Sequence, residues 1–147
     1  MYQQIISKIR TKDELDKLID ELDSLLNSFY EKEDHFNEVI KSYVRSWVAQ
    51  EIQDELKTVD DKKKSLNDFR ESLSTLRLIK LTLAYEPSDE DLDLIASWVR
   101  ENILPSLILD ISTSNSVLGG VVVEYEGKYF DLSLAKAISQ GLKRVAA

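Results

Sequence analysis

Residues 78–85 read LIKLTLAY, and this stretch decides the fold class. Ile79, Leu81 and Leu83 alternate with polar or small residues, which is the period-2 pattern of a half-buried β-strand. Pro87 then ends the pattern. Apolar residues before this stretch recur at helical spacing, so the strand marks the start of a second part of the chain.

The first part is predicted to be helical. Residues 1–70 contain neither glycine nor proline, the two residues that destabilise a helix interior most. Thr11 and Glu14 fit a capping box at the start of a helix. Two apolar stripes follow, separated by an acidic turn at residues 31–34, and both have helical spacing. The first is Leu15, Leu18, Ile19, Leu22, Leu25, Leu26 and Phe29, and the second is Phe36, Val39, Ile40, Tyr43 and Trp47, which Ile52 and Leu56 can extend. The pattern predicts an antiparallel helical hairpin, with a charged connector at residues 60–64 and a third helix that Ser65 caps.

The second part alternates strands with helices. Ser88 is predicted to cap a helix, with the following acidic residues 89–91 at the positive end of its dipole. Strands are expected at residues 107–112 and 118–125, and the turn at residues 126–128 leads into a final strand at residues 129–132.

Asp131 or Ser133 is then predicted to cap a terminal helix, which carries Leu134, Ile138 and Leu142 along one face. The whole pattern predicts an α+β fold. A helical hairpin or small bundle occupies residues 1–76, and a two-layer α/β domain with a mixed sheet occupies residues 77–147.

Composition excludes several classes of protein. The chain has 147 residues, no cysteine and a formal net charge of -8, with a pI of about 4.7. Disulfide scaffolds and thiolate metal sites are therefore excluded, and nucleic-acid binding is disfavoured because it depends on clustered Lys and Arg. No apolar run reaches the roughly 20 residues of a membrane span. The sequence predicts a cytoplasmic protein that meets a membrane only through a partner.

The sequence predicts no catalytic, cofactor or metal site. Gly119 and Gly120 run into a β-branched strand, whereas a phosphate-binding loop leads into a helix N-terminus. We therefore interpret them as a structural bulge or close backbone crossing. His35 is the only histidine and lies beside an acidic turn, without the nucleophile motif that a catalytic triad requires.

Two tryptophans and the C-terminus are candidates for partner binding. Trp47 and Trp98 lie on or beside apolar helical stripes, so each either packs in the core or anchors a partner helix. Residues 134–144 contain three basic side chains and no acidic one, which suits either an acidic partner or a solvated tail.

Residues 111–138 read ISTSNSVLGGVVVEYEGKYFDLSLAKAI and resemble the C-terminal signature of the delta subunit of F-type ATP synthases, the oligomycin-sensitivity-conferring protein family. An apolar pair, a double glycine, a β-branched strand, a glycine turn and an Asp-x-Ser pattern occur in the family's order. The matching residues are Gly119, Gly120, Gly127, Asp131 and Ser133. The resemblance extends from residue 78 onward. Leu134 stands where the family usually has a basic residue.

The resemblance implies a non-catalytic stator subunit of a rotary F-type ATP synthase. Such a subunit links the catalytic head to the peripheral stalk and resists rotor torque during proton-driven ATP synthesis. The implied partners are b-type stalk helices and the N-termini of alpha-type head subunits, on the inner face of an energy-transducing membrane. The family's N-terminal bundle is longer than the three helices predicted here, which leaves the contact with the head open.

Two alternatives remain at this point: a stator E-like subunit of an archaeal or vacuolar-type ATPase, and a free-standing helical adaptor or chaperone. In each case partners would bind apolar helical faces. The residues predicted to bind them are Leu15, Leu22, Phe29, Phe36, Tyr43 and Trp47 in the first part and Leu134, Ile138 and Leu142 in the second. The sequence leaves open which surface meets which partner.

Overall fold

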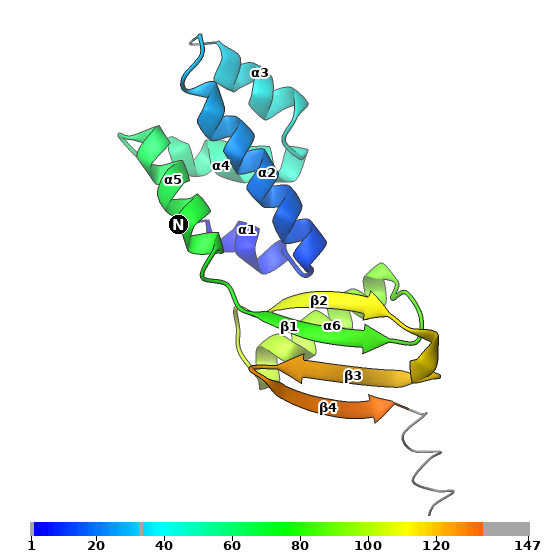
Figure 1. Ribbon diagram of the computed structural model, residues 1–147. Coiled ribbons are helices and arrows are strands. Elements are labelled where there is room, and N and C mark those ends of the chain that lie inside the picture. Colours follow the sequence, from blue (N-terminus) through cyan, green and yellow to red (C-terminus); the bar gives the residue numbers. More distant parts are fainter. Residues whose placement is uncertain (1, 33, 134–147) are drawn as a thin grey trace, which may run out of the picture. The chain divides into compact units, whose positions relative to one another are not determined.

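The computed structural model describes residues 2–32 and 34–133, and these residues form two compact units. Unit 1 comprises Met1–Ile9 and Asp13–Leu76, and unit 2 comprises Arg10–Lys12 and the described residues from Arg77 onward. Unit 1 is helical and unit 2 contains the sheet (Figure 1). The α+β fold class that the sequence predicts is confirmed.

The described residues of unit 1 form five helices: α1 (Gln3–Lys8), α2 (Lys12–Ser28), α3 (His35–Ser42), α4 (Ser46–Leu56) and α5 (Lys62–Leu73). Helices α2, α4 and α5 each bury an apolar stripe at helical spacing, whereas α1 and α3 each bury one residue, Ile5 and Ile40. The core side chains with no exposed surface come from four of these helices: Ile5, Leu18, Leu22, Leu25, Val48, Ile52 and Leu66. Burying a side chain of this size contributes about 1.5–3 kcal/mol, so this shared core is what holds the short helices together.

The prediction of three helices is wrong in three places. Helix α1 has no counterpart among the predicted helices, of which the first starts at Thr11. The second predicted helix is divided into α3 and α4, because Arg45 adopts φ -53° and ψ 136° and leaves the helical conformation. The third helix begins earlier than predicted. Asp61 caps it by accepting a hydrogen bond from the Lys64 backbone N–H at 2.9 Å, so the predicted cap Ser65 and part of the predicted connector lie inside α5.

Unit 2 is built on a four-stranded mixed sheet with the order β2-β1-β3-β4. Its strands are β1 (Leu78–Leu83), β2 (Ile108–Thr113), β3 (Gly120–Tyr125) and β4 (Lys128–Ser133). β1 pairs with β2 in parallel and with β3 antiparallel, and β3 pairs antiparallel with β4. A short 3-10 turn, Asn115–Val117, joins β2 to β3.

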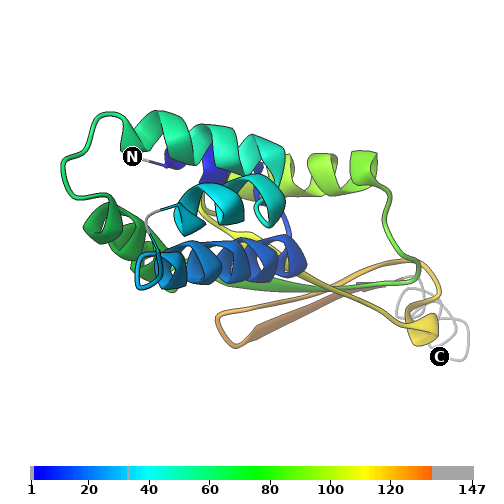
Figure 2. The same cartoon turned by 90° about the horizontal axis from the view of Figure 1, so that it is seen from above.

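Helix α6 (Asp89–Asn102) connects β1 to β2 and lies on one face of the sheet (Figures 1 and 2). Ser88 caps it as predicted. The Ser88 hydroxyl accepts from the Asp91 N–H and the Asp91 carboxylate accepts from the Ser88 N–H, both at 3.2 Å, which completes a capping box. The packed layer between helix and sheet includes Ile79, Val99 and Leu109.

The β3–β4 hairpin closes through Glu126 and Gly127, whose φ angles are +49° and +74°. Two successive positive φ angles are the mark of a type I′ turn, whose twist matches that of the strands. Asp131 and Ser133 belong to β4, so the strand continues beyond its predicted end at residue 132 and includes both predicted caps of a terminal helix. That predicted helix itself lies outside the described residues.

We expect Gly127→Ala to lower the free energy of unfolding by about 1 kcal/mol, because a Cβ atom is strained at positive φ. The space around Gly127 is open, with no atom within 4 Å of the position that a Cβ would take, so the cost comes from the backbone alone. Urea unfolding would measure it, with Lys128→Ala as the matched control in the same hairpin. An equal loss in both variants would contradict this account.

Candidate functional site

Five of the predicted partner-binding residues of unit 1 differ widely in exposure. Leu15 and Leu22 are buried in the core, at 6% and 0% exposed. Phe29 and Phe36 are half-buried and pack on each other, with ring centroids 5.0 Å apart. Tyr43 is 59% exposed. Tyr43 is therefore the member of this group that offers most of its surface to a partner.

Trp47, the sixth residue, is half-buried and lies beneath two cations. Lys8 Nζ and Arg45 Cζ lie 5.2 Å and 5.3 Å from the centroid of its ring. Such cation–π contacts contribute about 0.5–1 kcal/mol each at partly exposed sites. Much of the Trp47 ring is thus used within unit 1.

A buried ion pair fixes the junction between α3 and α4. Glu21 on α2 is 1% exposed, and its Oε1 accepts from the Arg45 backbone N–H and Nε, both at 2.9 Å. Its Oε2 accepts from Arg45 Nη2 at 3.0 Å. The carboxylate also sits at the N-terminus of α4, where the helix dipole favours negative charge. Glu21 has a structural role that its place in an acidic stretch of sequence does not reveal.

The N-terminal residues are tied to α4 and α5. The Tyr2 backbone N–H donates to Glu55 Oε1 at 3.0 Å, and the Tyr2 hydroxyl is 2.8 Å from the Ser65 hydroxyl. The Tyr2 ring stacks on Phe69 with centroids 4.2 Å apart. Burial raises the pKa of the Tyr2 phenol, the hydrogen bond with Ser65 opposes this effect, and the Glu55 carboxylate adds to the rise.

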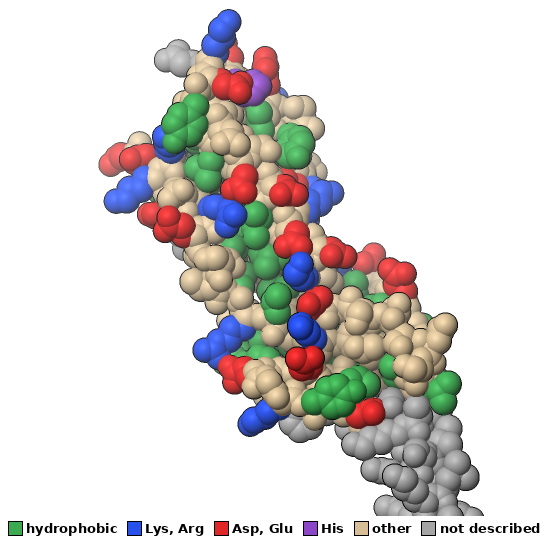
Figure 3. Space-filling model, in the orientation of Figure 1, with side chains coloured by type: hydrophobic (Ala, Val, Ile, Leu, Met, Phe, Trp, Pro, Cys, Tyr) green, Lys and Arg blue, Asp and Glu red, His purple; other side chains and the backbone are tan. Residues whose placement is uncertain are grey.

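The face of unit 1 that Figure 3 shows mixes acidic and basic side chains. Among the described residues of unit 1, Tyr30 is the most exposed large apolar residue, at 75%, and Lys63 Nζ lies 3.9 Å from its ring centroid. His35 Nε2 and Nδ1 lie 2.9 Å from Glu31 and 3.4 Å from Glu38. The side chains of His35, Glu31 and Glu38 are therefore already engaged in contacts with one another around the acidic turn.

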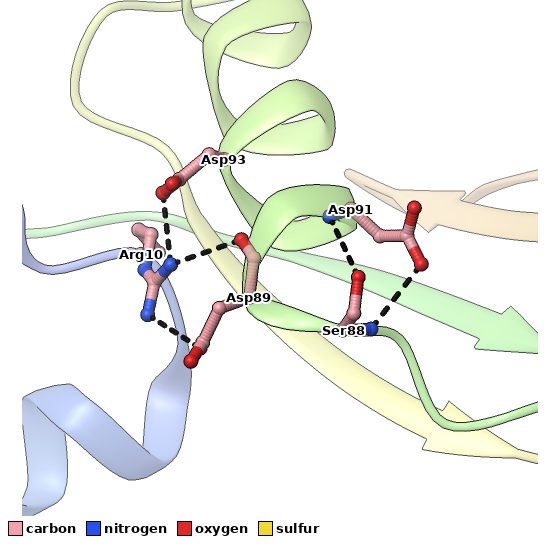
Figure 4. Close-up of polar contacts among 5 residues, drawn as sticks. All are labelled: Arg10, Ser88, Asp89, Asp91 and Asp93. Atoms are coloured by element: carbon pink, nitrogen blue, oxygen red, sulfur yellow. Dashed lines mark hydrogen bonds and ion pairs between the residues drawn. The ribbon is translucent and has the colours of Figure 1, made fainter.

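The acidic side chains at the start of α6 form hydrogen bonds and ion pairs within unit 2 (Figure 4). Arg10 Nη1 donates to Asp93 Oδ1 at 2.8 Å, and Arg10 Nη2 donates to Asp89 Oδ1 at 3.3 Å. Asp91 completes the capping box with Ser88. Within the described part of the chain, no group of three or more His, Cys, Asp or Glu side chains is arranged to hold a metal ion.

The double glycine leads into a strand and not into a helix N-terminus. Gly120 is the first residue of β3 and has φ +74°, and Leu118, two residues before it, has φ +62°. The chain thus reverses direction sharply between the 3-10 turn and β3. Positive φ at Gly120 costs little, because glycine has no Cβ.

Unit 2 also has an apolar groove that Trp98 lines but none of the predicted partner-binding residues from Leu15 to Trp47 does. Its volume is about 660 Å³, and it lies between α6 and the β3 side of the sheet. Leu94 and Trp98 on α6 line it and are 71% and 60% exposed. The sequence contains an indication of this groove: Leu94 and Trp98 are large apolar residues four apart on α6, and they lie apart from its buried residues Ala96 and Val99.

None of the helices formed by residues 2–32 and 34–133 combines the length and hydrophobicity that crossing a membrane requires.

Comparison with known proteins gives relatives of one kind. The ATP synthase subunit delta of Pseudothermotoga lettingae is 38% identical over 65 residues, which cover 44% of this chain and 36% of that protein. The ATP synthase subunits delta of Thermotoga petrophila and Thermotoga maritima are each 39% identical over 67 residues, which cover 45% of this chain and 34% of theirs. The chain thus matches only about a third of the length of these relatives.

The family comparison covers much more of the chain. The family described as ATP synthase delta (OSCP) subunit matches residues 19–144. The match extends the resemblance from the sheet unit back into α2, and it decides between the delta-type and E-type stator subunits in favour of the former. With most of its length matched, from the helical unit through the sheet, this chain belongs to the ATP synthase delta (OSCP) subunit family.

Proposed function

We propose that this chain is a stator subunit in the peripheral stalk of a rotary F-type ATP synthase. It links the catalytic head to the stalk and resists rotor torque, and it performs no chemistry of its own. The observation that carries the proposal is the family match over residues 19–144. The two compact units support it, because a linking protein needs two separate binding surfaces.

Unit 1 binds the catalytic head in this proposal, through the N-terminal segments of alpha-type subunits. Tyr43 is its best anchor, because an exposed aromatic ring buries a large area on binding at a small entropic cost. Phe29 and Phe36 present the half-buried edges of their stacked rings beside the α2–α3 turn. Leu15 and Leu22 act by holding the helices in place, since they are buried.

Unit 2 binds the peripheral stalk, through a b-type helix that packs on the helical layer over the sheet. In the described residues this layer is α6, and Leu134, Ile138 and Leu142 belong to the predicted helix that would complete it. Helix-on-helix docking of this kind uses side chains at i, i+3, i+4 and i+7 spacing. The protein is then located on the inner face of the membrane by its partners.

Binding experiments with the full chain test the proposal. We expect the chain to bind the isolated catalytic head, and separately a peptide of the stalk helix's C-terminal part, with Kd values of about 1 µM or lower, equivalent to about -8 kcal/mol. Tyr43→Ala should weaken head binding about tenfold and leave peptide binding unchanged. Tyr85→Ala, which removes an equally exposed ring in unit 2, is the matched control for head binding.

Isothermal titration calorimetry would measure both affinities. Absence of any complex at tens of micromolar with either partner would overturn the stator assignment and return the chain to the adaptor class. Equal weakening of head binding by Tyr43→Ala and Tyr85→Ala would overturn the placement of the head contact on unit 1.

A further inference from the structure

The outer strand of the sheet in unit 2 carries a short segment from the start of the chain. β2 is the edge strand, and residues 10–12, here called the strap, belong to the same unit. The Leu109 N–H donates to the Arg10 carbonyl at 2.8 Å, and Thr11 forms a parallel bridge with Leu109. Many peptides are recognised in this way, by adding an extended segment to the edge of a sheet.

The arginine of the strap has acidic partners on α6 (Figure 4). Arg10 Nη1 donates to Asp93 Oδ1 at 2.8 Å and to the Asp89 carbonyl at 3.3 Å, and Arg10 Nη2 donates to Asp89 Oδ1 at 3.3 Å. The Arg10 side chain is 20% exposed, whereas those of Asp89 and Asp93 are 88% and 68% exposed. A guanidinium suits two separate carboxylates because its donors form a fixed fork. Both carboxylates are also within reach of an arginine from another molecule.

The strap uses only the first part of the β2 edge. Helix α2 begins at Lys12, so the chain leaves β2 directly after Thr11. Within the part of the chain that the structure describes, the strap forms one bridge, at Leu109, whereas β2 continues to Thr113. Ser112 and Thr113 are exposed. The edge is therefore longer than the segment that lies on it.

The backbone donors of β2 alternate between its two sides. The N–H groups of Ile108 and Ser114 donate to carbonyls on the β1 side, whereas the Leu109 N–H donates outward to the strap. By the same alternation, the N–H groups of Ile111 and Thr113 point outward. A longer extended segment, parallel to β2, would find these donors in line with the one that the strap already uses.

We propose that the outer edge of β2 is a docking site for an extended segment of a partner protein that carries an arginine. The segment runs parallel to β2, and its arginine takes the position of Arg10 between Asp89 and Asp93. The residues after the arginine pair with Ile111 and Thr113. The strap holds this site in the free protein, and the partner segment displaces it. This docking site is separate from the helical surfaces of the proposed function.

A longer segment competes with the strap because it forms more contacts. Ion pairs with exposed carboxylates contribute little individually, so the main advantage of the strap is the high effective concentration of a segment in the same chain. A segment that continues along β2 adds backbone hydrogen bonds and cross-strand side-chain pairs. The net charge of -8 attracts a basic segment and repels a second copy of this chain. These terms favour a basic, extended partner.

A labelled peptide of sequence KIRTVTVT tests the proposal with the full chain. Its start repeats residues 8–11, and its remainder extends the strand with β-branched side chains. The double variant Arg10→Gly with Thr11→Gly weakens the hold of the strap. We expect this variant to bind the peptide about tenfold more tightly than the unchanged chain does, because the strap competes less. Fluorescence anisotropy measures both Kd values, and circular dichroism checks the fold.

The arginine contacts are tested in the double variant. The peptide KIQTVTVT, which lacks the arginine, should bind about fivefold more weakly than KIRTVTVT. Adding Asp93→Asn should weaken binding of KIRTVTVT by a similar factor. Glu90→Gln is the matched control, because Glu90 is exposed on the same helix and makes none of the contacts in Figure 4. Equal losses for Asp93→Asn and Glu90→Gln, or equal binding of the two peptides, would overturn the arginine site.

Hydrogen exchange in the unchanged chain gives a test that does not depend on any variant. At saturating KIRTVTVT, the Ile111 and Thr113 amides should exchange about tenfold more slowly, and the Ser112 amide, on the β1 side, should change little. Nuclear magnetic resonance resolves these amides. Absence of this protection, or no binding at about 1 mM peptide, would overturn the proposal. Dimers of the double variant in sedimentation would also overturn it, in favour of a second copy on the edge.

Discussion

Arg45→Ala is expected to lower the free energy of unfolding of unit 1 by about 3 kcal/mol, because it leaves the buried Glu21 carboxylate with its main partner removed. Glu21 accepts three hydrogen bonds from Arg45, two of them from the side chain. The Glu21 side chain is 2% exposed, so water cannot replace the lost donors without opening the unit. The variant also loses the cation above the Trp47 ring.

Arg70→Ala is the matched control for this experiment. Arg70 pairs with Asp23 at 2.9 Å, again in unit 1, but its side chain is 30% exposed and that of Asp23 is 47% exposed. Exposed pairs of this kind contribute at most about 1 kcal/mol. Urea unfolding followed by circular dichroism at a helix wavelength compares the two. Similar losses in both variants would show that burial does not govern the Glu21 pair.

Leu22→Ala is expected to destabilise unit 1 by about 3 kcal/mol, within the range of about 2–5 kcal/mol found for leucine truncation in cores. Leu22 has no exposed surface, and it lies among other fully buried side chains such as Leu18 and Leu25 on the same stripe of α2. The small side chain leaves a cavity that the surrounding helices close only in part.

Tyr43→Ala separates packing from partner binding in the same unit. Since Tyr43 is 59% exposed, its truncation should change the free energy of unfolding by only about 0.5 kcal/mol. Urea titration of both variants measures the difference. A loss for Tyr43→Ala as large as that for Leu22→Ala would mean that Tyr43 supports the fold, and its use as a partner anchor would fail.

The features that depend on neighbouring residues were predictable from the sequence. The alternation in β1, the Ser88 cap with its acidic first turn, and the hairpin at Glu126 and Gly127 all follow from side chains within a few residues of one another. Such local preferences agree with the final fold here, which is why the α+β class could be inferred from the pattern alone.

The break at Arg45 was not predictable in this way. No glycine or proline marks it, and the apolar spacing continues through it. The cause is Glu21, which lies 24 residues earlier in the sequence and takes the Arg45 backbone N–H away from the helix. A contact of this range leaves no periodic trace in the sequence, so tertiary structure overrides the local helical preference.

Which residues of the apolar stripes are free to bind a partner was likewise not predictable from the sequence. A stripe such as Leu15 to Phe29 shows that a helix face is covered, but not whether the chain itself or a partner covers it. In the structure Leu15 and Leu22 are covered by the chain's own helices. The converse holds for Leu94 and Trp98, which lie apart from the buried residues of α6, Ala96 and Val99, and yet line the apolar groove.

The three residues Arg10–Lys12 belong to the sheet unit although the chain on both sides of them belongs to the helical unit. Thr11 forms a parallel bridge with Leu109, and the Arg10 carbonyl accepts from the Leu109 N–H at 2.8 Å. Cutting the gene at codon 77 would therefore yield a fragment whose outer strand β2 has lost its neighbour. A strand with unpaired backbone groups at its edge pairs readily with other molecules. Any fragment that contains unit 2 should therefore include residues 10–12 as a fused or added peptide.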